Sequence, residues 1–229
     1  MIALLYDVHG NLPALEAVIA DAQAAGATEW LVGGDIAMFG PYPRETVERL
    51  RELEPARWLR GNVDRWSAFP DEAPDGEPAG GGIAAVRAEL GDEVVAELGR
   101  LPESLALADD ARAWHASPKS DVESFFPDPL PDDDALLEGV TERRLVFGHT
   151  HLPFRREHRG VELINPGSVG MPLDGDHRAA YALLHDDGRV EHRRAVYPHE
   201  EALATLRERF DGEWVEIVAR RLESARIQG

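Results

Sequence analysis

The chain begins with an uninterrupted apolar run, and a strand-turn-helix pattern follows it. Ile2 to Tyr6 is apolar throughout, which is typical of a central strand covered on both faces. Apolar residues at helical spacing then fill residues 12–26, where Asn11 is a suitable N-cap and Gly26 a suitable end. The next elements predicted are strands at 29–33 and 57–60 with a helix at about 44–53 between them. This alternation predicts an α/β protein.

The rest of the chain is predicted to contain a loop, a helix, two hairpins and a helical C-terminus. Residues 69–82 are rich in Pro, Gly and acidic residues, which predicts a mobile loop, and helical periodicity returns at 83–98. The remaining predicted elements are a hairpin of 105–108 with 111–115 about Asp109 and Asp110, strands at 145–147 and 160–164, a hairpin of 179–185 with 189–196, and helical structure over 199–226 with a break near Gly212.

Length and composition favour one large α/β domain over residues 1–229. The chain has 229 residues, of which 43% are hydrophobic, and contains neither an internal repeat nor a recognisable linker. It has no cysteine, so disulfides and thiolate metal ligands are excluded. The N-terminus lacks the features of a signal peptide, and no apolar run approaches the ~18 residues needed to span a bilayer. These features predict a cytoplasmic protein without a membrane partner; the oligomeric state is left open.

The charge is strongly negative and argues against binding of duplex nucleic acid. Forty-three acidic residues against 24 basic residues give a formal net charge of -19, whereas duplex recognition needs a basic face. A small phosphate substrate is still compatible, because bound cations reverse the local sign. Residues 121–142 carry eight carboxylates and no Lys or Arg, which predicts a solvated surface loop. Phe125 and Phe126 within it are either a hydrophobic tether or part of a lid, and we favour the tether.

Histidine and carboxylate side chains follow several of the predicted strands. Gly148 allows a turn after the strand at 145–147, and His149 and His151 stand two residues apart, so both rings point to one side while the chain is extended. A pair of histidines in a surface turn is the alternative reading. Asp7 and His9 follow the first strand in a strand-to-helix turn, where open α/β sheets place their ligands.

Taken together, these side chains make a plausible site for two metal ions. Imidazole and carboxylate ligands suit first-row transition metals, and two such ions can clamp the oxygens of an in-line phosphoryl displacement. One carboxylate would have to bridge the two ions. The seven side chains predicted at strand ends are Asp7, His9, Asp35, Asn62, His115, His149 and His151.

Six short motifs occur in one order along residues 2–185. They are Asp7-x-His9-Gly10-Asn11, Gly34-Asp35 followed by Gly40-Pro41, Gly61-Asn62-x-Asp64, His115-x-Ser117-Pro118, Gly148-His149-x-His151 and Asn165-Pro166-Gly167-Ser168. Any single motif is weakly specific. The six in this order resemble the calcineurin-like metallophosphoesterases, in particular their small bacterial and archaeal branch.

The resemblance implies a fold, a ligand set and an activity. The fold would be two mixed β-sheets packed as a sandwich and flanked by helices, in four αββα layers. The activity would be hydrolysis of small phosphodiesters or phosphomonoesters by a hydroxide activated by two divalent ions, with Mn²⁺ as first choice and Fe, Zn or Ni as alternatives. The resemblance assigns Asp7, His9, Asp35 and His151 to a first ion, Asp35, Asn62, His115 and His149 to a second ion, and catalytic roles to Asp35, Asn62, Asp64 and His115.

Two points qualify the assignment to an enzyme. The family commonly has His where this chain has Val63, and that His is usually assigned to protonating the leaving group. General acid catalysis typically contributes ~10²–10⁴-fold, so activity toward poor leaving groups is in question, although the neighbouring Arg65 is a second source of positive charge. The alternative function is a binding or scaffold protein on the same fold. Such relatives usually lose several ligands, whereas all seven are present here, which favours the enzyme.

Overall fold

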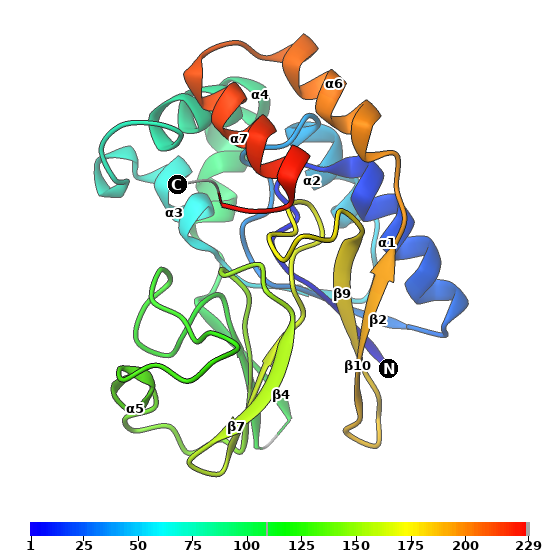
Figure 1. Ribbon diagram of the computed structural model, residues 1–229, viewed down its shortest axis with the longest axis vertical. Helices are drawn as coiled ribbons and strands as arrows, with labels where there is room; N and C mark the ends of the chain where they lie inside the picture. Colours follow the sequence, from blue (N-terminus) through cyan, green and yellow to red (C-terminus); the bar gives the residue numbers. More distant parts are fainter. Residues whose placement is uncertain (109, 228–229) are drawn as a thin grey trace.

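Two five-stranded mixed sheets form the centre of the molecule (Figure 1). The computed structural model describes residues 1–108 and 110–227. The first sheet has the order β10 (Val190–Ala195), β9 (Ala179–Leu184), β1 (Ile2–Leu5), β2 (Glu29–Val32) and β3 (Ala56–Trp58). The second has the order β4 (Ser104–Ala108), β5 (Ala111–Trp114), β6 (Arg144–Val146), β8 (Val161–Asn165) and β7 (Phe154–His158). The expected pair of mixed sheets is confirmed.

The apolar run at the N-terminus is explained by burial of both faces of β1. Ala3 and Leu5 belong to the large core between the first sheet and the helices, while Leu4 and Tyr6 belong to the core between the two sheets. The inter-sheet core is completed by residues of the second sheet, including Val146 of β6. A strand with two buried faces needs apolar side chains at every position, so its sequence shows no alternation.

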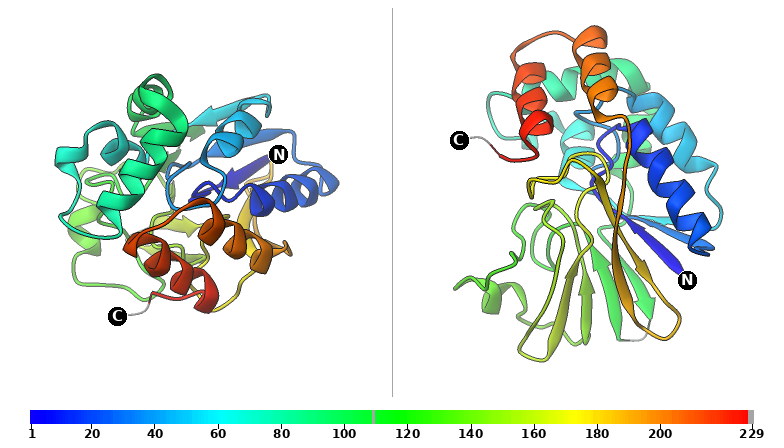
Figure 2. Two further views of the ribbon diagram at one scale, coloured as in Figure 1. Left: turned by 90° about the horizontal axis from the view of Figure 1, so that it is seen from above. Right: turned by 45° about the vertical axis from the view of Figure 1, so that its right-hand side comes forward.

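Helices cover the outer face of the first sheet, and Figures 1 and 2 show them gathered in one half of the molecule with the strands in the other. Their apolar residues share one core with the helix-facing side of β1 and β2. A short helix, α3 (Asn62–Ala68), follows β3 and is succeeded by the 3₁₀ turn η1 (Pro70–Glu72). The other helices on this side are α1 (Leu12–Ala24), α2 (Pro43–Arg51), α4 (Ala79–Gly99), α6 (His199–Arg209) and α7 (Glu213–Ser224).

The outer face of the second sheet is covered mainly by an irregular segment. Phe125 is fully buried there, with its ring centroid 5.0 Å from that of Phe147, and the one-turn helix α5 (Asp133–Leu136) contributes Leu136 to the same cluster. Asp133 is 1% exposed and pairs with Arg156 at 2.6 Å. The prediction of a solvated loop over 121–142 holds for residues 126–132, which are all exposed, and is wrong at Ser124, Phe125, Asp133, Leu136 and Leu137, which are buried. Phe125 anchors the segment as a tether.

Several predicted elements are confirmed, and others are wrong for identifiable reasons. Both hairpins are present, although the turn residue Asp109 of the first lies outside the described residues, and Gly212 separates α6 from α7 with φ of 106°. The predicted loop at 69–82 instead contains η1 and the start of α4, since Ala79 and Ile83 face the core. The helix predicted at 83–98 is interrupted at Gly91. Three short elements, α3, α5 and β7, were not predicted.

Within the described residues, every helix is too short or too polar to cross a bilayer.

Candidate metal centre

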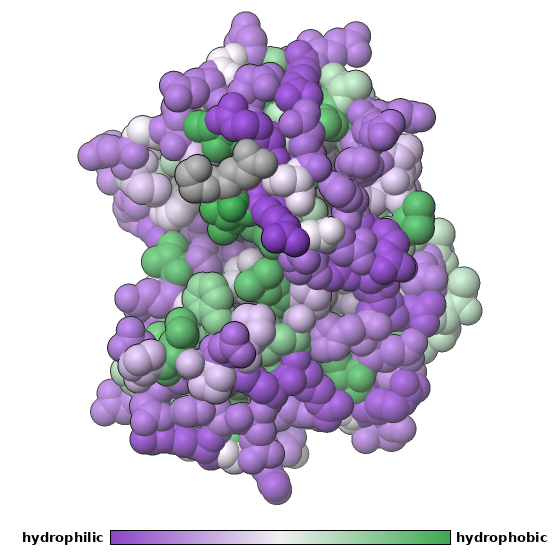
Figure 3. Space-filling view, viewed as in Figure 1, coloured by the Kyte–Doolittle hydropathy of each residue, from purple (hydrophilic) through white to green (hydrophobic). Residues whose placement is uncertain are grey.

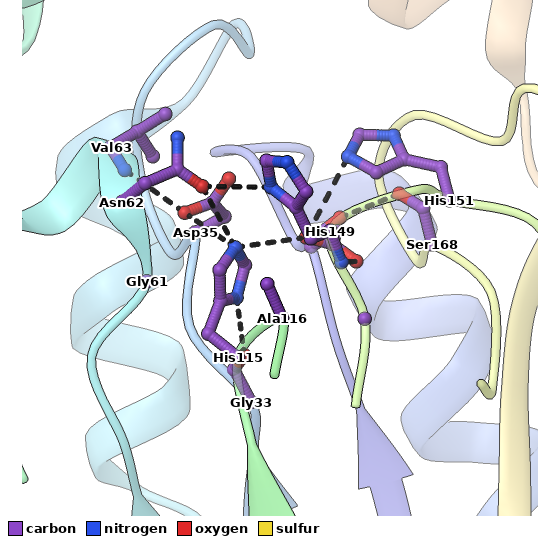
Figure 4. A network of polar contacts seen from close by, with 12 residues as sticks. Gly33, Asp35, Gly61, Asn62, Val63, His115, Ala116, His149, His151 and Ser168 are labelled. Carbon is purple, nitrogen blue, oxygen red and sulfur yellow. Dashed lines mark hydrogen bonds and ion pairs between the residues drawn. The ribbon is translucent and has the colours of Figure 1, made fainter. Parts of the chain in front are cut away.

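All seven side chains predicted at strand ends meet where the two sheets approach each other. Figure 4 shows five of them, Asp35, Asn62, His115, His149 and His151. Each of the loops that carries them follows the C-terminal end of a strand. Asp7 and His9 follow β1, Asp35 follows β2, Asn62 opens α3 after β3, His115 follows β5, and His149 and His151 follow β6. Two groups of potential metal-binding atoms result, one of Asp7, His9 and His151 and one of Asp35, His115 and His149.

The first group directs unshared electron pairs at one point. The Nδ1 atoms of His9 and His151 donate to backbone carbonyls, at 2.9 Å to Met38 O and 2.6 Å to Met171 O. Burial lowers the pKa of both imidazoles, so both rings are neutral and their Nε2 atoms, 3.2 Å apart, both carry lone pairs. Asp7 Oδ1 is buried without a hydrogen-bond partner, 3.6 Å from His151 Nε2. A cation would satisfy all three atoms.

The second group shows the same convergence. His115 donates from Nδ1 to Gly33 O at 2.9 Å, and its Nε2 lies 2.9 Å from Asn62 Oδ1 and 3.3 Å from Asp35 Oδ1. His149 Nδ1 lies 2.9 Å from the same amide oxygen. If both rings were neutral and no cation were bound, the Asn62 amide would be better turned over, with its NH₂ toward the two rings. An amide oxygen that faces two ring nitrogens fits a shared metal ion.

The charges in the second group are consistent with a cation site. Burial alone would lower the pKa of His115, but the carboxylates of Asp35 and Asp7 raise it to about 10. In the absence of a cation, the protonated His115 therefore supplies the positive charge between these carboxylates. Burial and the charged His115 lower the pKa of His149 to about 4. Burial would raise the pKa of Asp35, yet the surrounding imidazoles hold it well below its usual value, which keeps Asp35 ionised.

Asp35 lies between the two groups and turns one oxygen toward each. Its Oδ2 is 3.8 Å from Nε2 of His9, whereas its Oδ1 is 3.3 Å from Nε2 of His115. The side chain is 4% exposed and sits on the floor of the site. This position suits a carboxylate that binds two ions at once.

The backbone at the site adopts an uncommon conformation. Five of the seven side chains belong to residues with positive φ, namely Asp7 (54°), His9 (50°), Asp35 (53°), His149 (67°) and His151 (59°). Such conformations are disfavoured outside glycine, persist where the surrounding structure enforces them, and cluster at functional sites. Here the loops after β1 and β2 hold each other, with His9 N–H donating to Asp35 O at 2.9 Å.

The same conformation corrects one expectation from the sequence. His149 and His151 were expected to point to one side because they stand two apart in an extended strand. Both residues have positive φ, so the chain is not extended there, and the two rings enter different groups. The pair therefore contributes one ring to each half of the site.

Asp64 is placed to hold the loop of Asp35. Its Oδ2 accepts hydrogen bonds from the backbone N–H groups of Asp35 and Gly61, both at 2.9 Å, and its Oδ1 accepts one from Ile36 N–H at 3.1 Å. Burial and the nearby charge of Asp35 raise the pKa of Asp64 to about 6. All the contacts of its carboxylate are to backbone, which fits a positioning role.

We expect Asp64→Asn to loosen this loop. An amide in place of the carboxylate would turn an NH₂ group toward at least one backbone donor, which costs about 1–3 kcal/mol for the lost and unsatisfied hydrogen bonds. The measurement is the free energy of unfolding in denaturant, with Asp71→Asn as the control at an exposed carboxylate. Equal stability of the two variants would contradict this role for Asp64.

Other motif residues brace the loops instead of entering the site. Asn165 donates to Gly148 O at 2.9 Å, and Ser168 donates to Asp7 O at 2.8 Å. Asn11 caps α1 through Ala14 N–H, as expected, and also donates to Gly170 O at 2.8 Å. These bonds connect the loop after β8 to the loops after β1 and β6.

Glycines in two of the motifs are required by close approach. At Gly61 a Cβ atom would collide with the carboxylate and backbone nitrogen of Asp35, and at Gly148 it would collide with the carboxylate of Asp7. Any other residue at either position would displace a carboxylate of the site.

Neither Val63 nor its neighbour Arg65 is free to act on a leaving group. Val63 is 2% exposed, packs with the large core, and donates its backbone N–H to Asp35 Oδ1 at 3.1 Å. Arg65 forms a bidentate pair with Asp121 at 2.6 and 2.8 Å and a further bond to Glu72 at 2.6 Å. Its charge is thus matched by two carboxylates, which argues against a role on the leaving group.

Sequence reasoning missed Arg221 of α7. This guanidinium is half-buried, lies close enough to His9 to lower its pKa, and within residues 1–108 and 110–227 has no carboxylate at ion-pair distance. Burial lowers the pKa of Arg221 itself. No sequence signal points to it, because its place beside the site depends on how α7 packs.

A sandwich of two mixed sheets with nitrogen and oxygen ligands grouped at its strand ends defines the class of metallophosphoesterases. The chain belongs to the calcineurin-like phosphoesterase superfamily, whose domain model matches residues 1–189. The residues beyond the match form β10, α6 and α7, which pack on the same core.

The chain is similar to two further proteins in sequence and to one solved structure. The chain is 31% identical to the Methanocaldococcus jannaschii protein MJ0912, over 94% of this chain and 95% of that one. It is 29% identical to the Escherichia coli phosphodiesterase YfcE, over 79% and 85% of the two chains. The crystal structure of a metallophosphoesterase from Sphaerobacter thermophilus matches with a TM-score of 0.80 and 30% identity, covering 98% of each chain.

Proposed function

We propose that this protein is a metal-dependent phosphoesterase that hydrolyses small phosphodiesters or phosphomonoesters. The observation that carries the proposal is the pair of neighbouring groups, Asp7 with His9 and His151 and Asp35 with His115 and His149, together with the Asp35 carboxylate, which turns one oxygen toward each group. The similarity to a protein named a phosphodiesterase supports activity on diesters. All seven ligand side chains are present, which favours an enzyme over a scaffold protein.

The residues fit two divalent ions. Asp7, His9, Asp35 and His151 would hold the first, and Asp35, Asn62, His115 and His149 the second. When bound, the ions would supply Lewis acidity and lower the pKa of a nucleophilic water. Mn²⁺ is the first ion to test, with Fe, Zn and Ni as alternatives, since mixed nitrogen and oxygen ligands discriminate poorly among them.

The protein's own residues contribute orientation and charge. Asp64 holds the loop of Asp35, and the carbonyls of Met38 and Met171 fix the tautomers of His9 and His151 so that Nε2 faces the site. Arg221 adds a half-buried positive charge near His9. Bound cations together with this guanidinium would counter the net charge of -19 where an anionic substrate would bind.

The test is turnover of bis(p-nitrophenyl) phosphate before and after metal removal. We expect chelator-treated protein to lose at least about 10²-fold in rate and to recover with Mn²⁺. His9→Ala should show little recovery, whereas the control His158→Ala, which changes a histidine paired with Asp134 outside the site, should recover fully. Absence of turnover with every metal and ester tested would favour the scaffold alternative.

A further inference from the structure

A pocket of about 540 Å³ adjoins the metal centre. His149 and Thr150 line it on the side of the site, and apolar side chains line much of the remainder. Figure 3 shows hydrophobic residues gathered near the middle of this face. The apolar side chains that line the pocket are Val122, Phe126, Leu152, Leu173 and Ile227.

The pocket offers apolar surface that no other part of the described chain covers. Phe126 is 40% exposed and Ile227 is 67% exposed, although each lies within two residues of an anchored one. Phe125 is buried next to Phe126, and the Phe126 carbonyl accepts a hydrogen bond from Arg156 at 2.8 Å. At the other side, Gly175 N–H donates to Ala225 O at 2.9 Å and ties down the end of α7. The pocket is therefore preformed and able to bury an apolar group.

The polar groups of the pocket suit an anion with an apolar substituent. His149 is the only one of the seven ligand side chains that is not fully buried, so the pocket opens toward the place where a phosphoryl group would bind. Arg226 also lines the pocket, and within residues 1–108 and 110–227 no carboxylate lies at ion-pair distance from it. The nearby Asp174 is paired with Arg194.

We propose that this pocket binds the organic group of the substrate, and that the substrates are phosphoesters of apolar alcohols or phenols. The inference rests on the proposed phosphoesterase function, which places the phosphoryl group beside His149. An aromatic ring or alkyl chain attached to that group would then lie against Phe126, Leu173 and Ile227. Burial of this surface favours such esters over those with small or polar substituents.

The test compares two phosphonates whose carbon–phosphorus bond resists hydrolysis. Calorimetric titration of the Mn²⁺-loaded protein should show phenylphosphonate binding at least about 10-fold more tightly than methylphosphonate. Phe126→Ala and Ile227→Ala should each reduce this ratio several-fold. Both side chains are exposed, so neither change should unfold the protein. Val196→Ala is the control, because Val196 is 78% exposed and lies outside the pocket.

The outcomes separate this inference from the function on which it rests. Equal affinities for the two phosphonates would overturn the apolar pocket while leaving the phosphoesterase proposal intact. A preference for phenylphosphonate that both pocket variants retain would overturn it as well, since the ring would then bind elsewhere. Failure of both phosphonates to bind would overturn the proposed function and the pocket together.

Discussion

Asp35→Asn should lower kcat at least about 10³-fold and reduce the bound metal from two ions to less than one. The carboxylate turns one oxygen toward each ligand group, so its loss affects both, whereas an amide presents a donor to one of them. The measurement combines elemental analysis with turnover of an aryl phosphodiester.

A comparison with two other variants makes this prediction specific. His149→Ala removes a side chain of the second group alone and should leave about one ion bound. Asp71→Asn changes an exposed carboxylate and should bind two ions and turn over normally. Full activity and two ions in Asp35→Asn would show that Asp35 is not the bridge.

The second large effect concerns Val63. No imidazole stands at this position, and Arg65 is held by Asp121 and Glu72, so neither residue 63 nor Arg65 supplies a proton to the leaving oxygen. The rate should depend steeply on the pKa of the leaving group. Val63→His should flatten this dependence and raise turnover of alkyl esters by up to ~10²-fold if the ring reaches the leaving oxygen.

The experiment is a series of phosphodiesters with graded leaving groups. Val63 is 2% exposed, so a histidine must replace a packed side chain, and a misplaced ring would give a smaller gain. Val63→Leu is the matched control, since it adds bulk without a titratable group and should keep the steep dependence. If single-turnover rates of the unmodified protein are indifferent to leaving-group pKa, another residue supplies the proton.

Much of the architecture could be predicted from the sequence, because the burial of a strand or helix face requires a recognisable pattern of apolar residues. The apolar run of β1 reports two covered faces, and both hairpins and the break at Gly212 have clear turn signals. The short elements α3 and β7 have no such apolar pattern or turn signal in the sequence. The many carboxylates around Phe125 predicted an exposed loop. The buried ring of Phe125 instead fixes this segment against the second sheet.

The sequence predicted which side chains gather at the candidate site better than it predicted how they are arranged there. The ligand residues stand at strand ends, where the topology brings them together, so their types and positions sufficed. The division of His149 and His151 between two groups depends on positive φ, which the spacing of the residues does not reveal. The place of Arg221 depends on tertiary packing at the far end of the chain, and the position of Asp64 behind Asp35 depends on three backbone contacts.

The central claim is that two metal ions bind to ligand groups sharing Asp35, and anomalous diffraction from Mn²⁺-loaded crystals tests it most directly. We expect two anomalous peaks, one among Asp7, His9 and His151 and one among Asp35, His115 and His149. Both peaks should lie in contact with the Asp35 carboxylate. A single peak, or none at these side chains after loading, would contradict it.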